Sequence, residues 1–302
     1  MLRLARRKRL NLGQIWKPPE QRLHKQTMKI FDTKRPDINE GVKSQRFRVE
    51  QLPRVTPDNK WRTEAMRSYD QPMLLWFTRG QGRITIAGVR HGFGPHHAVF
   101  LPAGTMHAYE MLGQVLGMAV FFPKESTLDL PDSAIHFRFR DVQQQVELTA
   151  HIDNMNRELE EAHRGQDRAL LAHAGLMSVW LDRQITDENL HPLTADASQR
   201  LAAAFTALVE ADFRTGSTIN EYAAKLGVTP THLTRSCKMA CDRPASAILS
   251  DRVHFEARKL LRETHRPVKT IAEELGFSSA AYFTRAFLKQ TGQTPTEFRR
   301  AG

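Results

Sequence analysis

Residues 268–287 read VKTIAEELGFSSAAYFTRAF, and residues 219–237 read INEYAAKLGVTPTHLTRSC. The two segments are copies of one pattern. The pair Leu-Gly recurs 49 residues apart, at 226–227 and 275–276, and the next apolar-Thr-Arg triplet recurs 50 residues apart, at 233–235 and 283–285. The second copy therefore has one extra residue in its turn. This repeat defines the architecture of the C-terminal part of the chain.

Each copy predicts a helix, a turn and a second helix. Ala223 and Leu226 give the first helix of the first copy an apolar face. Gly227 and Gly276 lie where a helix ends with a positive φ, which glycine adopts at low cost. A tandem of such units, joined by a helical stretch at about 245–264, predicts two recognition helices in successive major grooves of DNA.

The predicted second helices begin with residues suited to that position. Thr229 can cap the first of them, and Pro230 follows at the first helical position. Ser278 or Ser279 can cap the other. The face that follows each cap is short, exposed and composed of small and basic residues, as a recognition helix requires.

The C-terminal segment resembles the DNA-binding domain of the AraC/XylS transcription regulators, closely over about 200–302. The matching residues are Ile271-Ala272, Gly276-Phe277, Tyr282-Phe283, Arg285, Phe287, Gly292, Pro295 and Phe298-Arg299, with the linking stretch Arg252 and Ala257 to Leu261. Two positions of the first copy depart from the pattern. Asp242 replaces a common glycine, and Cys237 replaces the aromatic residue found at Phe287.

The resemblance implies a set of DNA-contacting residues. These are Thr231, Thr234, Arg235 and Lys238 in the first copy, and Ala280, Ala281, Thr284 and Arg285 in the second. Arginine can bond guanine, and alanine and threonine methyls can contact thymine. The first copy is therefore expected to read more bases, and the second to use phosphates and shape. The alternative for Arg235 and Arg285 is a helix-capping or ion-pair contact within the protein.

Length, charge and composition limit the number of domains, the class of protein and the kind of partner. The chain has 302 residues, 40% hydrophobic and 25% charged, which favours two globular domains. No apolar run is long enough for a membrane span, and the basic start is not followed by the apolar stretch of a secretory signal. The net charge of +11 is concentrated at residues 1–27 and 194–302, which favours a polyanionic partner. We expect a cytoplasmic protein.

The fold class expected is α+β, with two domains. Short strands and Gly or Pro turns from about 45 to 123 predict a β-barrel or sandwich, and helical periodicity follows from about 141 to 186. The predicted boundaries are a basic leader at 1–27, a sensor barrel at 28–140, a helix pair at 141–186, a linker at 187–197 and the DNA-binding domain at 198–302. The leader is either a basic arm or an upstream extension before Met28. The helix pair either dimerises or packs only on its own barrel.

The barrel resembles a cupin through Pro102, Gly104 and His107, which match the second cupin motif. The family resemblance implies that such a barrel binds a small effector. No His-x-His pair precedes His107, and the adjacent His96 and His97 would point to opposite faces of a strand. We therefore expect no metal, no cofactor and no catalytic residue.

Candidate effector-binding residues combine ring surface with a polar group. They are Trp76, His107 and Tyr109, with Arg83, Arg46 or Arg48 as a partner for a carboxylate. The alternative is that these are ordinary core aromatics and surface arginines. Cys237 and Cys241, four residues apart on one helix, are poorly placed for a disulfide and are expected to be buried small hydrophobes; a redox switch is the alternative.

The sequence thus predicts a regulator that binds promoter DNA specifically and responds to an effector. The resemblance implies an activator, a homodimer and contact with RNA polymerase, and no membrane partner is expected. Two rivals stay open: a cupin metal enzyme fused to a DNA-binding module, and a constitutive DNA-binding dimer. The effector, the operator and the target genes have no signal in the sequence.

Overall fold

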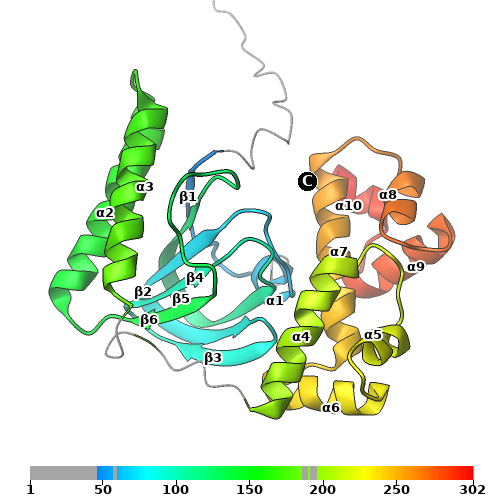
Figure 1. Ribbon diagram of the computed structural model, residues 1–302. Coiled ribbons are helices and arrows are strands. Elements are labelled where there is room, and N and C mark those ends of the chain that lie inside the picture. The colour runs from blue at the N-terminus through cyan, green and yellow to red at the C-terminus, as the bar shows by residue number, and fades with distance from the viewer. Residues whose placement is uncertain (1–45, 57–59, 186–189, 191–195, 302) are drawn as a thin grey trace, which may run out of the picture. The chain divides into compact units, whose positions relative to one another are not determined.

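An antiparallel sheet forms the N-terminal part of the described chain (Figure 1). The computed structural model describes residues 46–56, 60–185, 190 and 196–301. The predicted leader at 1–27 and most of the predicted linker at 187–197 lie outside these residues. The strands are β1 (Arg48–Gln51), β2 (Met73–Ile86), β3 (Val89–Phe93), β4 (His97–Leu101), β5 (His107–Phe121) and β6 (Ile135–Arg138).

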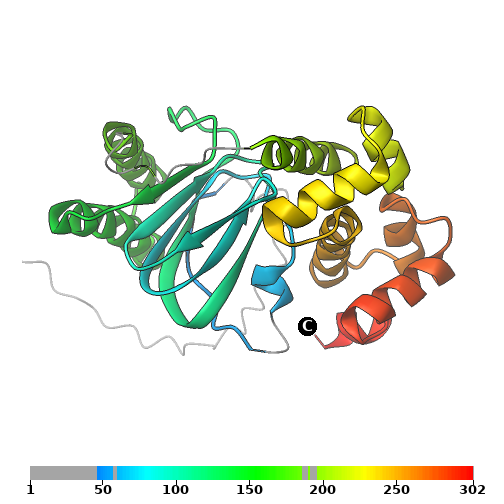
Figure 2. The ribbon, with the colours of Figure 1, turned by 90° about the horizontal axis from the view of Figure 1, so that it is seen from below.

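The central strand of this sheet is β2. It pairs with β5 along nearly its whole length, with β4 through its first half and with β3 through its second half. The register places Ile84 opposite Tyr109 and Leu74 opposite Val120. Irregular pairing near Phe77 and Arg79 bends the ladder, and Figure 2 shows a strongly curved sheet. The predicted β-rich domain is confirmed. Its described strands follow a path with ends at β1 and β6.

The two faces of the sheet have different partners, because successive side chains of a strand point to opposite sides. Leu74 and Trp76 belong to a core shared with the helices that follow the sheet. Leu75 and Phe77 belong to a second core that is made by the sheet itself.

The predicted helix pair is formed by α2 (Val142–Glu161) and α3 (Gln166–Arg183), which lie side by side (Figure 1). Leu148, Ile152 and Met155 of α2 are buried in the first core. Other apolar residues of the same helical periodicity, on both helices, face outward instead. Val142, Val146, Leu171 and Val179 are exposed, at 68, 56, 43 and 48%. The apolar residues recur at the predicted helical spacing, but they occupy a wider part of each helix surface than the sheet covers.

The C-terminal part is entirely helical, as predicted. Its helices are α4 (Ala197–Asp212), α5 (Ile219–Lys225), α6 (Pro230–Cys241), α7 (Ala245–Glu263), α8 (Val268–Glu274), α9 (Ala280–Thr291) and α10 (Pro295–Arg300). Their shared core is centred on buried aromatic residues, including Phe205, Tyr222, Phe283 and Phe287. The helix pairs α5–α6 and α8–α9 are the two repeat copies, and α7 joins them.

Residues 39–302 form one compact unit, so contacts between the sheet and the helices are part of the fold. Met66 belongs to the helical core, and it follows the short helix α1 (Trp61–Glu64). A guanidinium N–H of Arg243 donates to the carbonyl of Glu64 at 2.8 Å. Arg90 of β3 approaches the carboxylate of Asp242 at 3.4 Å. The domain boundaries drawn from the sequence remain predictions.

Candidate nucleic-acid interface

The two copies have the same backbone at their turns. Gly227 has φ +69° and Gly276 has φ +77°, as predicted for residues that end a helix in the left-handed region. The side chain of Thr229 accepts a hydrogen bond from the amide of His232, and that of Ser279 accepts one from the amide of Tyr282. The predicted caps are therefore present, and Ser279 is the capping serine in the second copy.

We expect Thr229→Ala to lower the free energy of unfolding by about 1 kcal/mol, since one amide at the start of α6 loses its acceptor. Thr231→Ala, two residues further on, removes an exposed side chain that has no capping role. It should leave the unfolding free energy within about 0.5 kcal/mol. Urea denaturation of the two variants measures both values. Equal losses would show that the Thr229 cap does not stabilise α6.

The face proposed for DNA contact on α6 is open to solvent. Thr231, Arg235 and Lys238 are exposed, Thr234 is half-buried, and all four line a surface depression of about 640 Å³. On the opposite side, Leu233 and Cys237 are fully buried. The structure therefore brings the four predicted residues of the first copy together.

The corresponding face of α9 has fewer side-chain groups available to form hydrogen bonds with a partner. Ala281 and Arg285 are exposed, while Ala280 and Thr284 are half-buried. The hydroxyl of Thr284 donates to the carbonyl of Ala280 at 2.9 Å, so its proton is already used within the helix. Tyr282, 53% exposed at the start of α9, was not among the predicted residues. Its position next to Ala281 in the first turn was the signal that could have singled it out.

The two predicted arginines, Arg235 and Arg285, are also candidates for contacts within the protein. Within the described residues, Arg235 and Arg285 have no ion pair and no side-chain hydrogen bond. The alternative reading of these residues as internal contacts thus finds no support there. Both guanidinium groups are free to reach a base edge or a phosphate.

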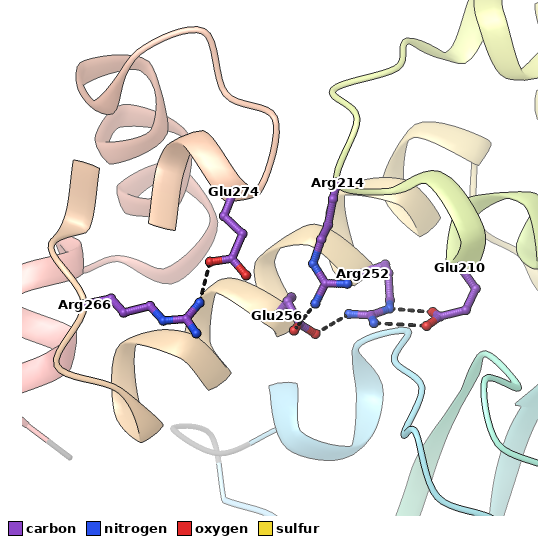
Figure 3. A network of polar contacts seen from close by, with 6 residues as sticks. All are labelled: Glu210, Arg214, Arg252, Glu256, Arg266 and Glu274. Atoms are coloured by element: carbon purple, nitrogen blue, oxygen red, sulfur yellow. Dashed lines mark hydrogen bonds and ion pairs between the residues drawn. The ribbon is translucent and has the colours of Figure 1, made fainter. Parts of the chain in front are cut away.

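A buried ionic network joins α7, the helix between the two copies, to α4 and the loop that follows it (Figure 3). Arg252 of α7 donates to Glu210 of α4 at 2.7 and 3.2 Å, and to Glu256, one turn along α7, at 2.9 Å. Arg214 donates to the same Glu256 at 2.6 Å. Burial opposes both charges, but the contacts with Glu210 and Glu256 raise the pKa of Arg252, and Arg252 lowers the pKa of Glu256. The Arg252 guanidinium also lies 3.8 Å from the Phe213 ring centroid.

The two departures from the family pattern are accommodated. Asp242 adopts φ +60° at the end of α6, where the second copy has Gly292 at φ +75°. Cys237 is fully buried, as Phe287 is in the second copy. Cys237 and Cys241 are free thiols, and burial raises the pKa of Cys237 to about 12. The prediction of buried small hydrophobes is confirmed, and a thiol so protonated is a poor redox group.

The predicted effector residues are brought together only in part, because Tyr109 and Arg48 line one cavity whereas Trp76 and Arg83 do not. Trp76 lies on the helix-covered face, and its indole N–H donates to Thr149 of α2 at 3.3 Å. Arg83 is about half-exposed and lies 3.8 Å from Glu110. Only His107 and Tyr109 share a face of β5. Trp76 lies on the opposite face of the sheet, which the helices cover. The alternation of side chains identifies the two faces of a strand but not which face the helices cover, so the sequence could not predict this separation.

His107 and Tyr109 are both buried beside Arg67. Burial, together with the nearby Arg67, lowers the pKa of His107 to about 3. Burial also raises the pKa of Tyr109 to about 12. His107 is therefore neutral and Tyr109 is protonated at neutral pH. Arg67 was not singled out from the sequence, where no local pattern distinguishes it from the surface arginines.

The remaining histidines give no metal cluster in the part of the chain that the structure describes. Nδ1 of His97 lies 2.9 Å from Nε2 of His136, while the ring of His96 lies 6.0 Å from that of Trp76. The adjacent histidines thus have different neighbours, as expected. In the same described residues, no helix is long and apolar enough to cross a membrane.

Comparison with known proteins identifies similarity in the C-terminal part of this chain. A family model described as a helix-turn-helix domain matches residues 222–301. The Right origin-binding protein of Escherichia coli K12 is 37% identical over 83 residues, which are 28% of this chain and 29% of that protein. The Arabinose operon regulatory protein of the same organism is 28% identical over 154 residues, 49% of this chain and 51% of that protein. The chain therefore matches 29 to 51% of the length of these relatives.

One solved structure covers more of the chain. It is wild-type ToxT from Vibrio cholerae with a bound unsaturated fatty acid, at 13% identity and a TM-score of 0.40, covering 84% of this chain and 94% of that one.

Proposed function

We propose that this chain, in which a helix-turn-helix family model matches residues 222–301, is a transcription regulator of the AraC/XylS type that binds promoter DNA and responds to a small-molecule effector. One observation carries the DNA-binding part: both copies present an unpaired arginine, Arg235 or Arg285, on an exposed helix face. The proposed contacts are Thr231, Thr234, Arg235, Lys238, Ala280, Ala281, Thr284 and Arg285, to which we add Tyr282.

The proposal gives the two copies different tasks. Arg235, with Lys238 and Thr231 beside it, supplies the hydrogen bonds for reading bases. The α9 face offers alanine methyls and a single arginine, which suit thymine contacts and phosphate positioning. Relatives at 28–37% identity are named as regulators or as an origin-binding protein.

We expect Arg235→Ala to weaken binding to the preferred DNA site by about 5- to 150-fold, or roughly 1–3 kcal/mol, and to relax base preference at one position. The site is first selected from genomic fragments with the purified full chain. Binding of a labelled duplex is then followed by fluorescence anisotropy over a range of salt concentrations.

Arg183→Ala, at the exposed end of α3, is the matched control, because it removes the same charge outside the two repeats. It should leave affinity for the site nearly unchanged. An equal loss for Arg235→Ala on the selected site and on a scrambled duplex would refute base reading by Arg235. It would leave only a phosphate contact.

The proposal extends to partners. Exposed apolar residues on α2 and α3, among them Val142 at 68% and Leu176 at 61%, support a homodimer through the helix pair. We also propose that this regulator activates transcription through RNA polymerase. Its proposed location is the cytoplasm, where the promoter lies. We propose no catalytic activity and no metal. A constitutive DNA-binding dimer is the rival, and it would keep the same DNA affinity with every compound of an effector library.

A further inference from the structure

A cavity of about 670 Å³ lies between the sheet and α7. Its size is within the range of sites that bind small organic molecules. Six cationic side chains and three acidic ones line it. The cations are Arg48, Arg62, Arg67, Arg258, Lys259 and Arg262. The cavity is thus electropositive, and its charges come from both parts of the fold.

Arg67 is the innermost of these cations. Its side chain is almost fully buried, at 1% exposed. One terminal nitrogen donates to the carbonyls of Thr63 and Ala65 at 2.7 and 3.3 Å. Its Nε is buried with no partner, and no carboxylate lies within ion-pair distance among the described residues. A buried guanidinium without a counter-charge is costly, and an anion beside it would remove that cost.

A second arginine on the same cavity shares only the unpartnered Nε, because its charge is paired with Glu50. Nε of Arg48 is also buried without a partner, although its terminal nitrogens contact Glu50 and Gln71. Across the cavity, Arg258 of α7 is 4% exposed, and burial lowers its pKa to about 10. Positively charged side chains therefore face the cavity from the sheet side and from α7, and among them Arg67 has no carboxylate partner within the described residues.

Aromatic rings supply the rest of the wall. The ring of Tyr69 lies 5.2 Å from Phe121 of the sheet and 6.2 Å from Phe255 of α7. The Arg67 guanidinium lies 4.7 Å from the ring centroid of Tyr109. An occupant would therefore meet charge at one end and flat apolar surface along its body.

We propose that this cavity binds an organic carboxylate with an apolar body, its carboxylate on Arg67 and Arg48 and its body against Tyr69, Tyr109 and Phe255. Such a ligand touches α7, which joins the two helix-turn-helix copies, as well as the sheet. Its role as the effector rests on the function proposed above; its binding does not.

Calorimetric titration of the full chain, without DNA, tests the binding with two matched pairs of probes. Indole-3-acetate is compared with indole-3-acetamide, and octanoate with octanamide, because each amide keeps the shape and loses the charge. At least one acid should bind tenfold or more tightly than its amide, since a charge-assisted contact strengthens binding to that degree. Acid and amide binding equally, or neither acid binding, would overturn the proposal.

Variants locate the site. Arg67→Met should remove the acid's advantage over the amide, while Arg138→Gln, at an exposed position of β6, should keep it. Arg262→Gln, at the exposed rim on α7, provides a second variant with little effect on the core and should reduce the advantage in part. An unchanged advantage in both Arg67→Met and Arg262→Gln would place the ligand elsewhere and overturn the assignment.

The DNA assay separates this inference from the proposed function. Acid binding that changes the affinity for the selected duplex supports both. Acid binding that leaves DNA affinity unchanged supports the cavity and overturns its role as the effector site. Specific DNA binding without acid binding overturns the cavity and leaves the DNA-binding function standing.

Discussion

An Arg252→Ala variant should unfold with a free energy about 3–5 kcal/mol lower than the parent chain, because it removes one side of a buried ion pair. Glu256 is 7% exposed and would keep only Arg214 as a partner. Glu210 would lose both of its bonds to the guanidinium. The face-on contact of Arg252 with Phe213 would also be lost. These losses make Arg252 the most sensitive ionic position of the helical part.

The control is Arg266→Ala, which breaks the other ion pair in Figure 3. Arg266 and Glu274 are joined at 2.7 Å, but their side chains are 51% and 32% exposed, so solvent screens the pair. Its removal should cost about 1 kcal/mol or less. Urea denaturation followed by circular dichroism measures both variants. A loss for Arg252→Ala no larger than that for Arg266→Ala would show that burial does not set the strength of this network.

Gly276→Ala should lower the free energy of unfolding by about 3 kcal/mol or more. The left-handed conformation at φ +77° alone costs an alanine about 1–2 kcal/mol. A Cβ at Gly276 would also lie against the backbone, at Gly216 N and 2.7 Å from the carbonyl oxygen of Arg214. These atoms cannot rotate away, so the loop after α4 must shift, at a further cost of about 1–3 kcal/mol.

Gly227→Ala is the matched variant, because it makes the same change at the same place in the first copy. Gly227 has φ +69°, and a Cβ there would meet no atom within 4 Å. Only the conformational cost of about 1–2 kcal/mol remains. The difference between the two variants in thermal or urea unfolding therefore isolates the contact with Gly216. Equal losses of unfolding free energy would mean that the loop after α4 moves without cost and that the close approach of Gly276 to Gly216 does not stabilise the fold.

The helical part could be predicted from the sequence because its signals are local. Thr229 and Ser279 bond amides three residues away, and Gly227 and Gly276 mark turns by their own backbone preference. The one-residue offset between copies also survives in the structure, since α5 and α8 begin 49 residues apart, at 219 and 268, and α6 and α9 begin 50 apart, at 230 and 280.

The sheet and the cavity could be predicted only in part, because they depend on residues far apart in the chain. Alternation identifies the two faces of β2, but the register with β5 and the irregular pairing near Phe77 determine what Trp76 meets. Trp76 was therefore grouped with Tyr109 although the two lie on different faces. Arg67 has no local signature at all. Its neighbours Tyr109 and Phe255 come from β5 and α7, so its burial emerges only from tertiary packing.

Eleven of the nineteen residues of α7 are buried, and four of these carry formal charge: Asp251, Arg252, Glu256 and Arg258. Apolar side chains tolerate a sliding or rotated helix, whereas charges bonded to fixed partners, such as Arg252 with Glu210 and Glu256, do not. The buried contacts of α7 therefore fix the offset between the two proposed recognition helices, α6 and α9. Under the function proposed above, surface substitutions on α6 and α9 can change the preferred bases during evolution. The distance between the two recognised base clusters should be the trait of its operators that drifts most slowly.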